Sequence, residues 1–206
     1  MSIQIKHCRI RINFYFFALL CVISFFDRSG MLLAGLLSAL LHECGHLTVM
    51  LLTPGQAPSE ISVTPFGIRI YGAPLAEFTD GSLAVLTAGS GANFLIGGAA
   101  LVFSPHLAAL NFVMGAMNLL PVDTLDGGGI VRLLLRRVCT ERTAEYLLTA
   151  LSLLTLTGMA LAGVGILCRT GYNFSLLAMS LWLLLSLLLR LTGHSKSHSK
   201  NGSRKT

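Results

Sequence analysis

The segment Leu40-Leu41-His42-Glu43-Cys44-Gly45-His46-Leu47 lies inside a long apolar run and decides how the rest of the chain is interpreted. His42 and His46 are four residues apart, so on an α-helix they share one face and can bind a single metal ion. Glu43 lies about 100° further round the helix than His42, beside both rings. A carboxylate at that place can accept a proton from a water molecule instead of binding the metal. The H-E-x-x-H spacing therefore predicts a zinc hydrolase in which His42 and His46 are ligands and Glu43 is the base.

The apolar run around this segment covers residues 31–53 and is long enough to cross a bilayer. Apart from Cys44, its only ionisable residues are His42, Glu43 and His46. Ionisable groups inside a membrane helix cost several kcal/mol unless they have partners, so they mark a functional site by default. The competing interpretation is that two histidines pack between helices while Glu43 reaches the membrane surface. The energetic cost makes it the weaker of the two.

The composition of the whole chain excludes an ordinary soluble domain. Of its 206 residues, 53% are hydrophobic and 12% are charged, and the mean hydropathy is +0.73, which is typical of a multi-pass membrane protein. The net charge of +6 does not indicate a nucleic-acid partner, because the basic residues lie between apolar runs and near the C-terminus. The five cysteines are scattered and form no C-x-x-C pair, so no disulfide framework is expected.

We expect an all-α polytopic membrane protein with about six transmembrane helices. The predicted spans are residues 12–26, 31–53, 82–103, 106–120, 146–168 and 174–191. Together they make one membrane domain, residues 1–192, and the polar, basic tail 193–206 is expected to be disordered. The first span follows basic residues as a signal peptide does. Asp27-Arg28 comes next instead of a cleavage site, so we expect this span to be retained.

A small membrane-associated β-hairpin is predicted between the second and third spans, at residues 60–71. Ile61, Val63, Ile68 and Ile70 alternate with polar or small residues around a Pro-Phe-Gly turn, which is the periodicity of strands. The outer edge of such a hairpin can pair with an extended segment of a substrate. The alternative is that the hairpin simply covers the site from lipid.

The distribution of lysine and arginine predicts the orientation in the membrane. With six spans, one side carries 13 of these residues and the other side carries only Arg28 and Arg169. The positive-inside rule therefore places both termini, the hairpin and the segment 121–145 in the cytosol of a cell-membrane protein. The third span is rich in Gly, Ala and Ser, so it is expected to pack at the centre of the helices.

A catalytic zinc ion usually has three protein ligands and one open position. Asp123 and Asp126 are the candidates for the third ligand, because both follow the fourth span on the cytosolic side. Asp126 is preferred because Gly127-Gly128-Gly129 lets the backbone turn and approach a neighbouring helix closely. Asp123 is better explained as a helix cap or a solvated turn residue.

Two motifs in register resemble the site-2 protease family of intramembrane zinc metalloproteases, family M50. They are His42-Glu43-Cys44-Gly45-His46 and Asn118-x-x-Pro121-x-x-x-x-Asp126-Gly127. The segment Ala88–Asn93 is similar to a third stretch of that family, Gly-Pro-x-x-Asn, with Ser90 where the proline is usual. Within the family, the six-helix layout resembles most the bacterial sporulation factor IVFB group.

The resemblance implies a zinc site made by His42, His46 and Asp126, with Glu43 as the catalytic base. The partners are then the lipid bilayer and a membrane-associated protein substrate. This substrate is cleaved near the cytosolic face, and a pro-sigma factor or another membrane-tethered regulator would suit the site.

Asn93 and Asn118 are candidate substrate-binding residues, since a side-chain amide can hold a substrate backbone or stabilise an oxyanion. The alternatives are an interhelical hydrogen bond for Asn93 and a helix cap for Asn118.

A second function, from another class, uses the same ligands: a membrane transporter or sensor for a metal, without hydrolysis. Only hydrolysis needs Glu43. A transport path also favours repeated polar sites along several helices, whereas the sequence shows a single cluster. A third interpretation, an inactive relative that holds substrates, is disfavoured by the intact Glu43.

Overall fold

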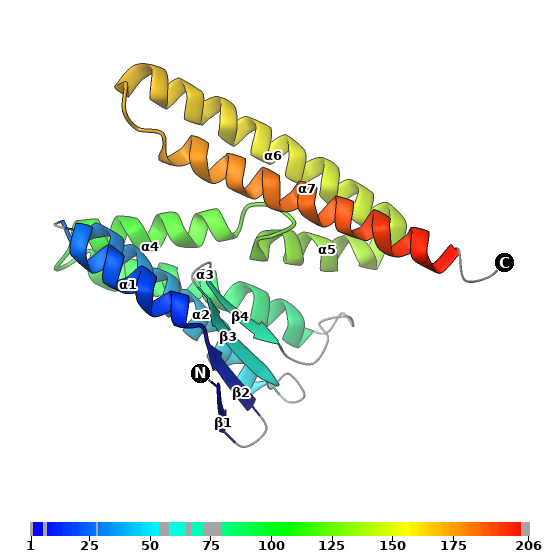
Figure 1. The fold of residues 1–206 in the computed structure, drawn as a ribbon, viewed down its shortest axis with the longest axis horizontal. Coiled ribbons are helices and arrows are strands. Elements are labelled where there is room, and N and C mark those ends of the chain that lie inside the picture. Colours follow the sequence, from blue (N-terminus) through cyan, green and yellow to red (C-terminus); the bar gives the residue numbers. More distant parts are fainter. Residues whose placement is uncertain are drawn as a thin grey trace. The chain divides into compact units, whose positions relative to one another are not determined.

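The computed structural model describes residues 2–5, 8–27, 29–53, 58–64, 67–71 and 80–202, which form seven helices and four strands (Figure 1). The chain divides into two compact units, Met1–Leu119 and Leu120–Thr206. The N-terminal unit contains β1 (Ser2–Ile5), β2 (Cys8–Ile12), α1 (Phe14–Phe26), α2 (Met31–Leu52), β3 (Glu60–Thr64), β4 (Gly67–Tyr71), α3 (Asp80–Ala100) and α4 (Pro105–Asn118). The C-terminal unit contains α5 (Asp126–Val138), α6 (Glu141–Thr170) and α7 (Ser175–Gly202).

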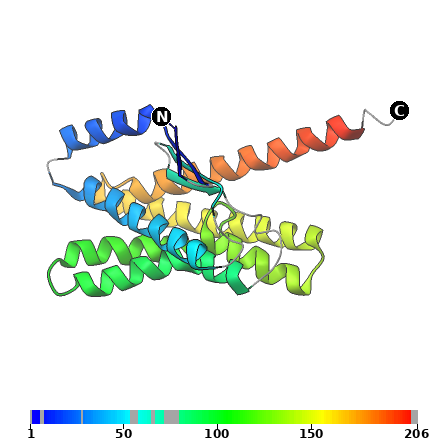
Figure 2. The ribbon, with the colours of Figure 1, turned by 90° about the horizontal axis from the view of Figure 1, so that it is seen from below.

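Helix α3 packs against both α2 and α4 in the N-terminal unit, as its small residues predicted. Figure 2 shows α3 and α4 side by side, joined by the tight turn 101–104. Ser104 ends that turn as the N-cap of α4, and Pro105 occupies the first helical position. The approach of α2 to α3 is close because Gly45 has no side chain. A Cβ there would lie 2.7 Å from the Ala88 carbonyl oxygen.

The strands form one sheet in the order β1-β2-β3-β4. β3 and β4 pair antiparallel within the segment 60–71, where the hairpin was predicted; residues 65–66, between them, lie outside the described part. β2 pairs with β3 in parallel, and an exposed Arg11–Glu60 ion pair of 3.4 Å joins them. β1 and β2 were not predicted, although residues 9–12 alternate arginine with isoleucine as a strand does.

In the C-terminal unit, α6 and α7 lie side by side and antiparallel (Figure 1). Its buried apolar cluster is made by Val122, Leu156, Leu183 and Leu187. Gly171, with φ of 76°, ends α6 in the left-handed conformation that glycine adopts without strain. α7 continues to Gly202, into the segment 193–206 that was predicted as a disordered tail, and its side chains beyond Leu191 lie outside the described residues. The predicted domain limits stay a prediction.

Three helices among the described residues are long and apolar enough to cross a membrane, namely Met31–Leu52, Gly81–Ala100 and Glu141–Thr170. A shorter apolar helix, Ser175–Leu191, follows them. Large apolar side chains on these helices face outwards, such as Leu52 at 77% and Leu154 at 71% exposure, which suits contact with lipid rather than with water. These features are those of a mostly helical, multi-pass membrane protein.

Helices also occur at the other predicted spans, but α1 and α4 are short. With 13 and 14 residues, they extend about 20 Å at 1.5 Å per residue, against about 30 Å for the hydrocarbon core of a bilayer. The number of six spans therefore stays a prediction.

Candidate metal centre

The two histidines of the H-E-x-x-H motif lie on the buried face of α2. The buried residues of this helix are Ser38, His42, His46 and Met50, each four residues after the one before. His42 is 5% and His46 is 8% exposed, and their Nε2 atoms lie 3.1 Å apart. The prediction that both rings share one helix face is confirmed.

Each ring is oriented by a hydrogen bond at its other nitrogen. His46 Nδ1 lies 2.7 Å from the Val85 carbonyl oxygen, which can only accept, so this nitrogen carries the proton. His42 Nδ1 lies 2.9 Å from Asn93 Oδ1 on α3. Asn93 Nδ2 donates to the Ser38 carbonyl oxygen at 3.3 Å, so Asn93 turns its oxygen to His42 and accepts from it. In the neutral form of each ring, a proton on Nδ1 leaves Nε2 with its lone pair.

Two lone pairs that face each other at 3.1 Å need a cation between or beside them, either a metal ion or a shared proton. Gly89 of α3 leaves the necessary room, because a Cβ there would lie 2.7 Å from His42 Nε2 and closer still to His46 Nε2. Imidazoles that are held at Nδ1 and turn Nε2 to the metal are common zinc ligands. The donor set of the N-terminal unit therefore fits zinc.

Glu43 and Cys44 follow His42 on α2. Glu43 is half-buried and directly follows His42 on the helix, so its side chain lies beside the buried face that carries the two rings. Cys44 is exposed and free. Its position two residues after His42 turns the thiol away from the ring, as expected from the helical period. The role of Glu43 as the base stays a prediction.

The two candidate substrate-binding amides differ in their surroundings. Asn93 is fully buried and joins α3 to α2 and α4, as its interhelical alternative requires. Asn118 is the last residue of α4 and is half-buried, and its Nδ2 donates to the Met114 carbonyl oxygen at 3.1 Å. That bond runs to a carbonyl group four residues earlier in α4, and the C-cap of the helix is Leu119, so Asn118 is not the cap that the alternative predicted. The substrate-binding role of both residues stays a prediction.

Asn111 of α4 was not identified from the sequence as a residue near the site. It is fully buried, and its Oδ1 accepts a hydrogen bond from Asn93 Nδ2 at 3.2 Å. A lone amide inside an apolar helix was the signal that could have found it, because polar groups at such depth require partners.

Asp126 is the first residue of α5, in the C-terminal unit, and is half-buried. The N-terminus of a helix favours a carboxylate at this place. Gly128 lies close to the preceding loop, since a Cβ there would be 2.6 Å from the Val122 carbonyl carbon. Gly128 therefore allows the close backbone approach that was expected of this glycine segment. Within the C-terminal unit, the approach is between α5 and the loop that precedes it.

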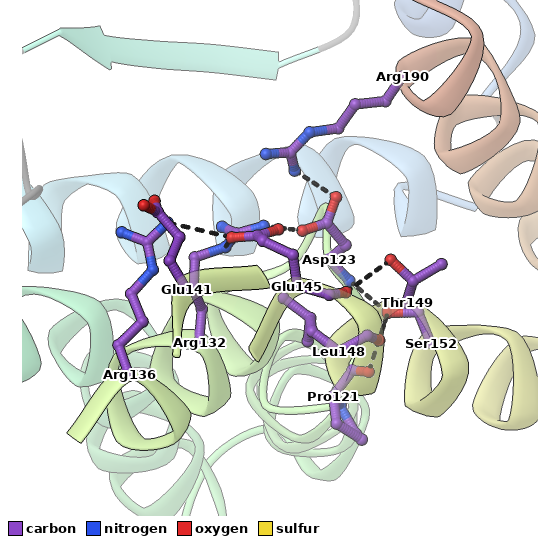
Figure 3. Close-up of polar contacts among 10 residues, drawn as sticks. All are labelled: Pro121, Asp123, Arg132, Arg136, Glu141, Glu145, Leu148, Thr149, Ser152 and Arg190. Carbon is purple, nitrogen blue, oxygen red and sulfur yellow. Dashed lines mark hydrogen bonds and ion pairs between the residues drawn. The ribbon is translucent and has the colours of Figure 1, made fainter. Parts of the chain in front are cut away.

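Asp123 is the centre of a second polar cluster in this unit (Figure 3). Its carboxylate is 8% exposed and forms ion pairs with Arg132 of α5 and Arg190 of α7. Its backbone N–H donates to Ser152 Oγ of α6 at 2.9 Å. Asp123 lies in a turn, as one of the two predicted alternatives has it, but its carboxylate is buried against two arginines instead of being solvated. Arg190 lies 67 residues away in the sequence, so local spacing could not reveal the pairing.

The cluster continues along α5 and α6 as Figure 3 shows, with Arg132 Nε donating to Glu145 at 2.8 Å. Arg136 donates to Glu141 at 2.8 Å and to Glu145 at 3.1 Å. These groups and Arg190 line a cavity of about 730 Å³. Arginines and carboxylates balance in charge around it, so the cluster ties the three helices of the unit together.

Comparisons with known proteins agree with this architecture. The model of Peptidase family M50 matches residues 99–159, a segment that includes Asn118 and Asp126. The structure is similar to that of the Site-2 Protease from Methanocaldococcus jannaschii, with a TM-score of 0.60 and 22% sequence identity; the match covers 92% of this chain and 94% of that chain. The fold is that of a site-2 protease. No curated protein matches the chain. Within this site-2 protease fold, the histidine pair lies on α2.

Proposed function

We propose that the protein is an intramembrane zinc metalloprotease that hydrolyses a peptide bond of a membrane-associated protein near the cytosolic face. The observation that carries this proposal is that two buried histidine Nε2 atoms lie 3.1 Å apart on α2, a helix long and apolar enough to cross a membrane. Ionisable groups at such a place are expensive and mark a functional site. The match to Peptidase family M50 and the site-2 protease fold support the same activity.

The proposed zinc ligands are His42 Nε2, His46 Nε2 and a carboxylate oxygen of Asp126. Asp126 is supported by its place in the segment that matches Peptidase family M50 and by its position at the start of α5. Bound zinc supplies Lewis-acid chemistry for peptide hydrolysis. The chain supplies fixed rings, since each imidazole is held at Nδ1 by an acceptor of its own unit.

Glu43 is the proposed general base. Its carboxylate accepts a proton from the attacking water molecule and then passes the proton to the amine of the departing peptide. The side-chain amide of Asn118 is proposed to hold the substrate backbone or to stabilise the oxyanion. For this, its Nδ2 exchanges the bond to the Met114 carbonyl oxygen for one to the substrate.

β4 is proposed to bind the substrate as an additional strand. It is at the edge of the sheet: β3 pairs with one side of it, and no described strand pairs with the other. A helical substrate hides its peptide bonds in its own hydrogen bonds and has to unwind before cleavage. A free sheet edge can pair with the unwound segment and keep it extended.

The substrate is further proposed to be a pro-sigma factor or another membrane-tethered regulator. The support is the resemblance to the sporulation factor IVFB group, together with the distribution of 13 lysines and arginines on one side against two on the other. That distribution favours cytosolic termini and a cytosolic sheet, so the product is released into the cytosol.

The second candidate function is a metal transporter or sensor that binds the same ion without hydrolysis. Such a protein needs the histidine pair but has no use for a carboxylate that moves protons. Its function would therefore be intact in a Glu43→Gln variant.

Co-expression with candidate membrane-tethered substrates separates the two functions. Wild type is expected to release a shorter, cytosolic product. Glu43→Gln is expected to contain as much zinc as wild type and to release no product. Cys44→Ser, on the exposed side of the same helix, is the matched control and is expected to cleave normally. Release of product by Glu43→Gln at the wild-type rate would overturn the protease proposal.

A further inference from the structure

A chain of three side chains runs from α4 through α3 to His42. Asn111 Nδ2 donates to the Leu107 carbonyl oxygen at 2.9 Å. Asn93 Nδ2 donates to Asn111 Oδ1 at 3.2 Å, and His42 Nδ1 donates to Asn93 Oδ1 at 2.9 Å. We infer that Asn111 is a positioning residue, which acts through Asn93 to hold His42 in the tautomer that turns its Nε2 lone pair to a metal ion. The inference rests on the proposed zinc site and gives a role to a residue of a third helix.

The direction of this chain is set by main-chain carbonyl groups, which can only accept hydrogen bonds. The Leu107 oxygen holds the NH2 end of Asn111, so the oxygen of Asn111 faces Asn93. The Ser38 carbonyl oxygen accepts from the same nitrogen of Asn93 at 3.3 Å. If the Asn93 amide turned over, its oxygen would face two acceptors. The observed orientation is therefore favoured from both sides.

The tautomer of His42 depends on this row of hydrogen bonds, whereas the tautomer of His46 does not. His46 Nδ1 faces the backbone oxygen of Val85, which cannot change from acceptor to donor. The partner of His42 is a side-chain amide, which can present either its oxygen or its NH2 group after a half-turn. With the NH2 group facing His42, the ring would carry its proton on Nε2 and could not bind zinc there.

The three side chains lie where water cannot replace a lost bond. Asn93 and Asn111 are 0% exposed and His42 is 5% exposed. A buried donor that loses its acceptor stays unsatisfied, so each of these hydrogen bonds depends on the others. Without the oxygen of Asn111, the Asn93 amide is oriented by the Ser38 carbonyl oxygen alone at that end, and the preference for one orientation weakens.

Three variants of the full chain, purified in detergent micelles, test the inference. Asn111→Leu keeps the volume of the side chain and removes the acceptor. Asn111→Asp keeps a carboxyl oxygen for Asn93 in either protonation state. Ser90→Ala is the matched control, because Ser90 is 1% exposed, lies one turn from Asn93 on α3, and has an Oγ without a hydrogen-bond partner in the described part of the chain.

Two quantities are measured: zinc affinity by competition with a chelator, and the His42 tautomer by nitrogen NMR of metal-free protein with labelled histidines. A His42→Ala variant assigns the signals. In wild type, metal-free His42 is expected to carry its proton on Nδ1. Asn111→Leu is expected to lose about 10–100-fold in zinc affinity, the usual effect of losing a partner behind a metal ligand. It is also expected to show His42 partly protonated on Nε2. Asn111→Asp and Ser90→Ala are expected to keep the wild-type affinity and tautomer.

The inference is overturned by any of three results. These are wild-type His42 protonated on Nε2, an unchanged affinity and tautomer in Asn111→Leu, or an equal loss of affinity in Asn111→Asp and Asn111→Leu. If Asn111→Leu does not fold, the wild-type tautomer and the Asn111→Asp variant decide. If wild type binds no zinc, the proposed function fails, and the tautomer of metal-free His42 still tests the chain from Asn111.

Discussion

Replacing Gly89 by alanine tests the proposed metal site without changing any of the proposed ligands. The added Cβ would lie 2.7 Å from both Nε2 and Cε1 of His42, and closer still to His46 Nε2. Ordinary contact begins at 3.4 Å, so the His42 ring has to move by about 0.7 Å, which is the difference between the two distances.

That movement is enough to break the hydrogen bond that orients the ring. Added to the 2.9 Å between His42 Nδ1 and Asn93 Oδ1, it gives up to about 3.6 Å, which is too long for a hydrogen bond. A buried donor left without its acceptor costs about 1–3 kcal/mol, equivalent to about 5–150-fold in affinity. The methyl group also takes space in front of both lone pairs. We therefore expect zinc affinity to fall by at least the upper end of that range.

Gly91→Ala is the matched control, because Gly91 is also on α3 and a Cβ there meets nothing within 4 Å. Alanine is favoured over glycine in a helix interior by about 1 kcal/mol, and both variants gain this contribution. Zinc retained against increasing chelator is measured together with Tm. Gly91→Ala should retain zinc as wild type does, with an equal or higher Tm. Equal zinc affinity in Gly89→Ala and Gly91→Ala would refute the reasoning that an ion lies in front of the two Nε2 atoms.

Three further predictions concern other parts of the chain. Asp123→Asn removes the buried charge that pairs with two arginines and should lower the free energy of unfolding by about 1.5–3 kcal/mol. Arg190→Gln should lower the free energy of unfolding by less than Asp123→Asn does, because the Arg190 side chain is 42% exposed. A lower Tm for Arg190→Gln than for Asp123→Asn would contradict this expectation. The Leu33 backbone N–H donates to the Asp27 carboxylate and lowers the pKa of that carboxyl below 3.8. The hydrogen bond therefore stabilises the fold fully above pH 3.8, and this stabilisation is lost as the pH falls through the lowered pKa. Asp27→Asn should remove that part of the dependence of Tm on acidic pH, and an identical profile in the variant speaks against it. A proline at Ile70 of β4 should leave the zinc content intact and abolish cleavage, because proline removes a backbone donor from the strand; unchanged cleavage rejects pairing of the substrate with β4.

The helices could be predicted because apolar runs and their ends are local signals. The second span was expected at 31–53, and the structure has Met31–Leu52, followed by Pro54, which cannot continue a helix. The fifth span was expected from Tyr146, but α6 already begins at Glu141. Its first turns are polar, so a count of apolar residues cannot include them.

The sheet and the polar networks could not be predicted, because residues far apart in the sequence make them. The alternation of residues 9–12 identifies a strand, yet nothing local identifies β3 as its partner. The neighbours of Asn93 could not be predicted for the same reason. Whether an amide meets a substrate or a ligand ring depends on its neighbours, and Asn111, which fixes its orientation, lies 18 residues further on a different helix.

The polar groups buried in α2, α3 and α4 favour hydrolysis over transport. Those among the described residues are Ser38, His42, His46, Ser82, Ser90, Asn93 and Asn111. His42, Asn93 and Asn111 form one row of hydrogen bonds that ends on a backbone carbonyl group, and the Nε2 edge of the His42 ring, which is proposed to bind the metal, lies at its other end. An ion that crosses a membrane needs a series of sites that it can leave as easily as enter. These amides bond to one another and to the backbone, so they offer the ion no second site. They hold one ring in one orientation, which a preorganised catalytic site requires and a transport path does not.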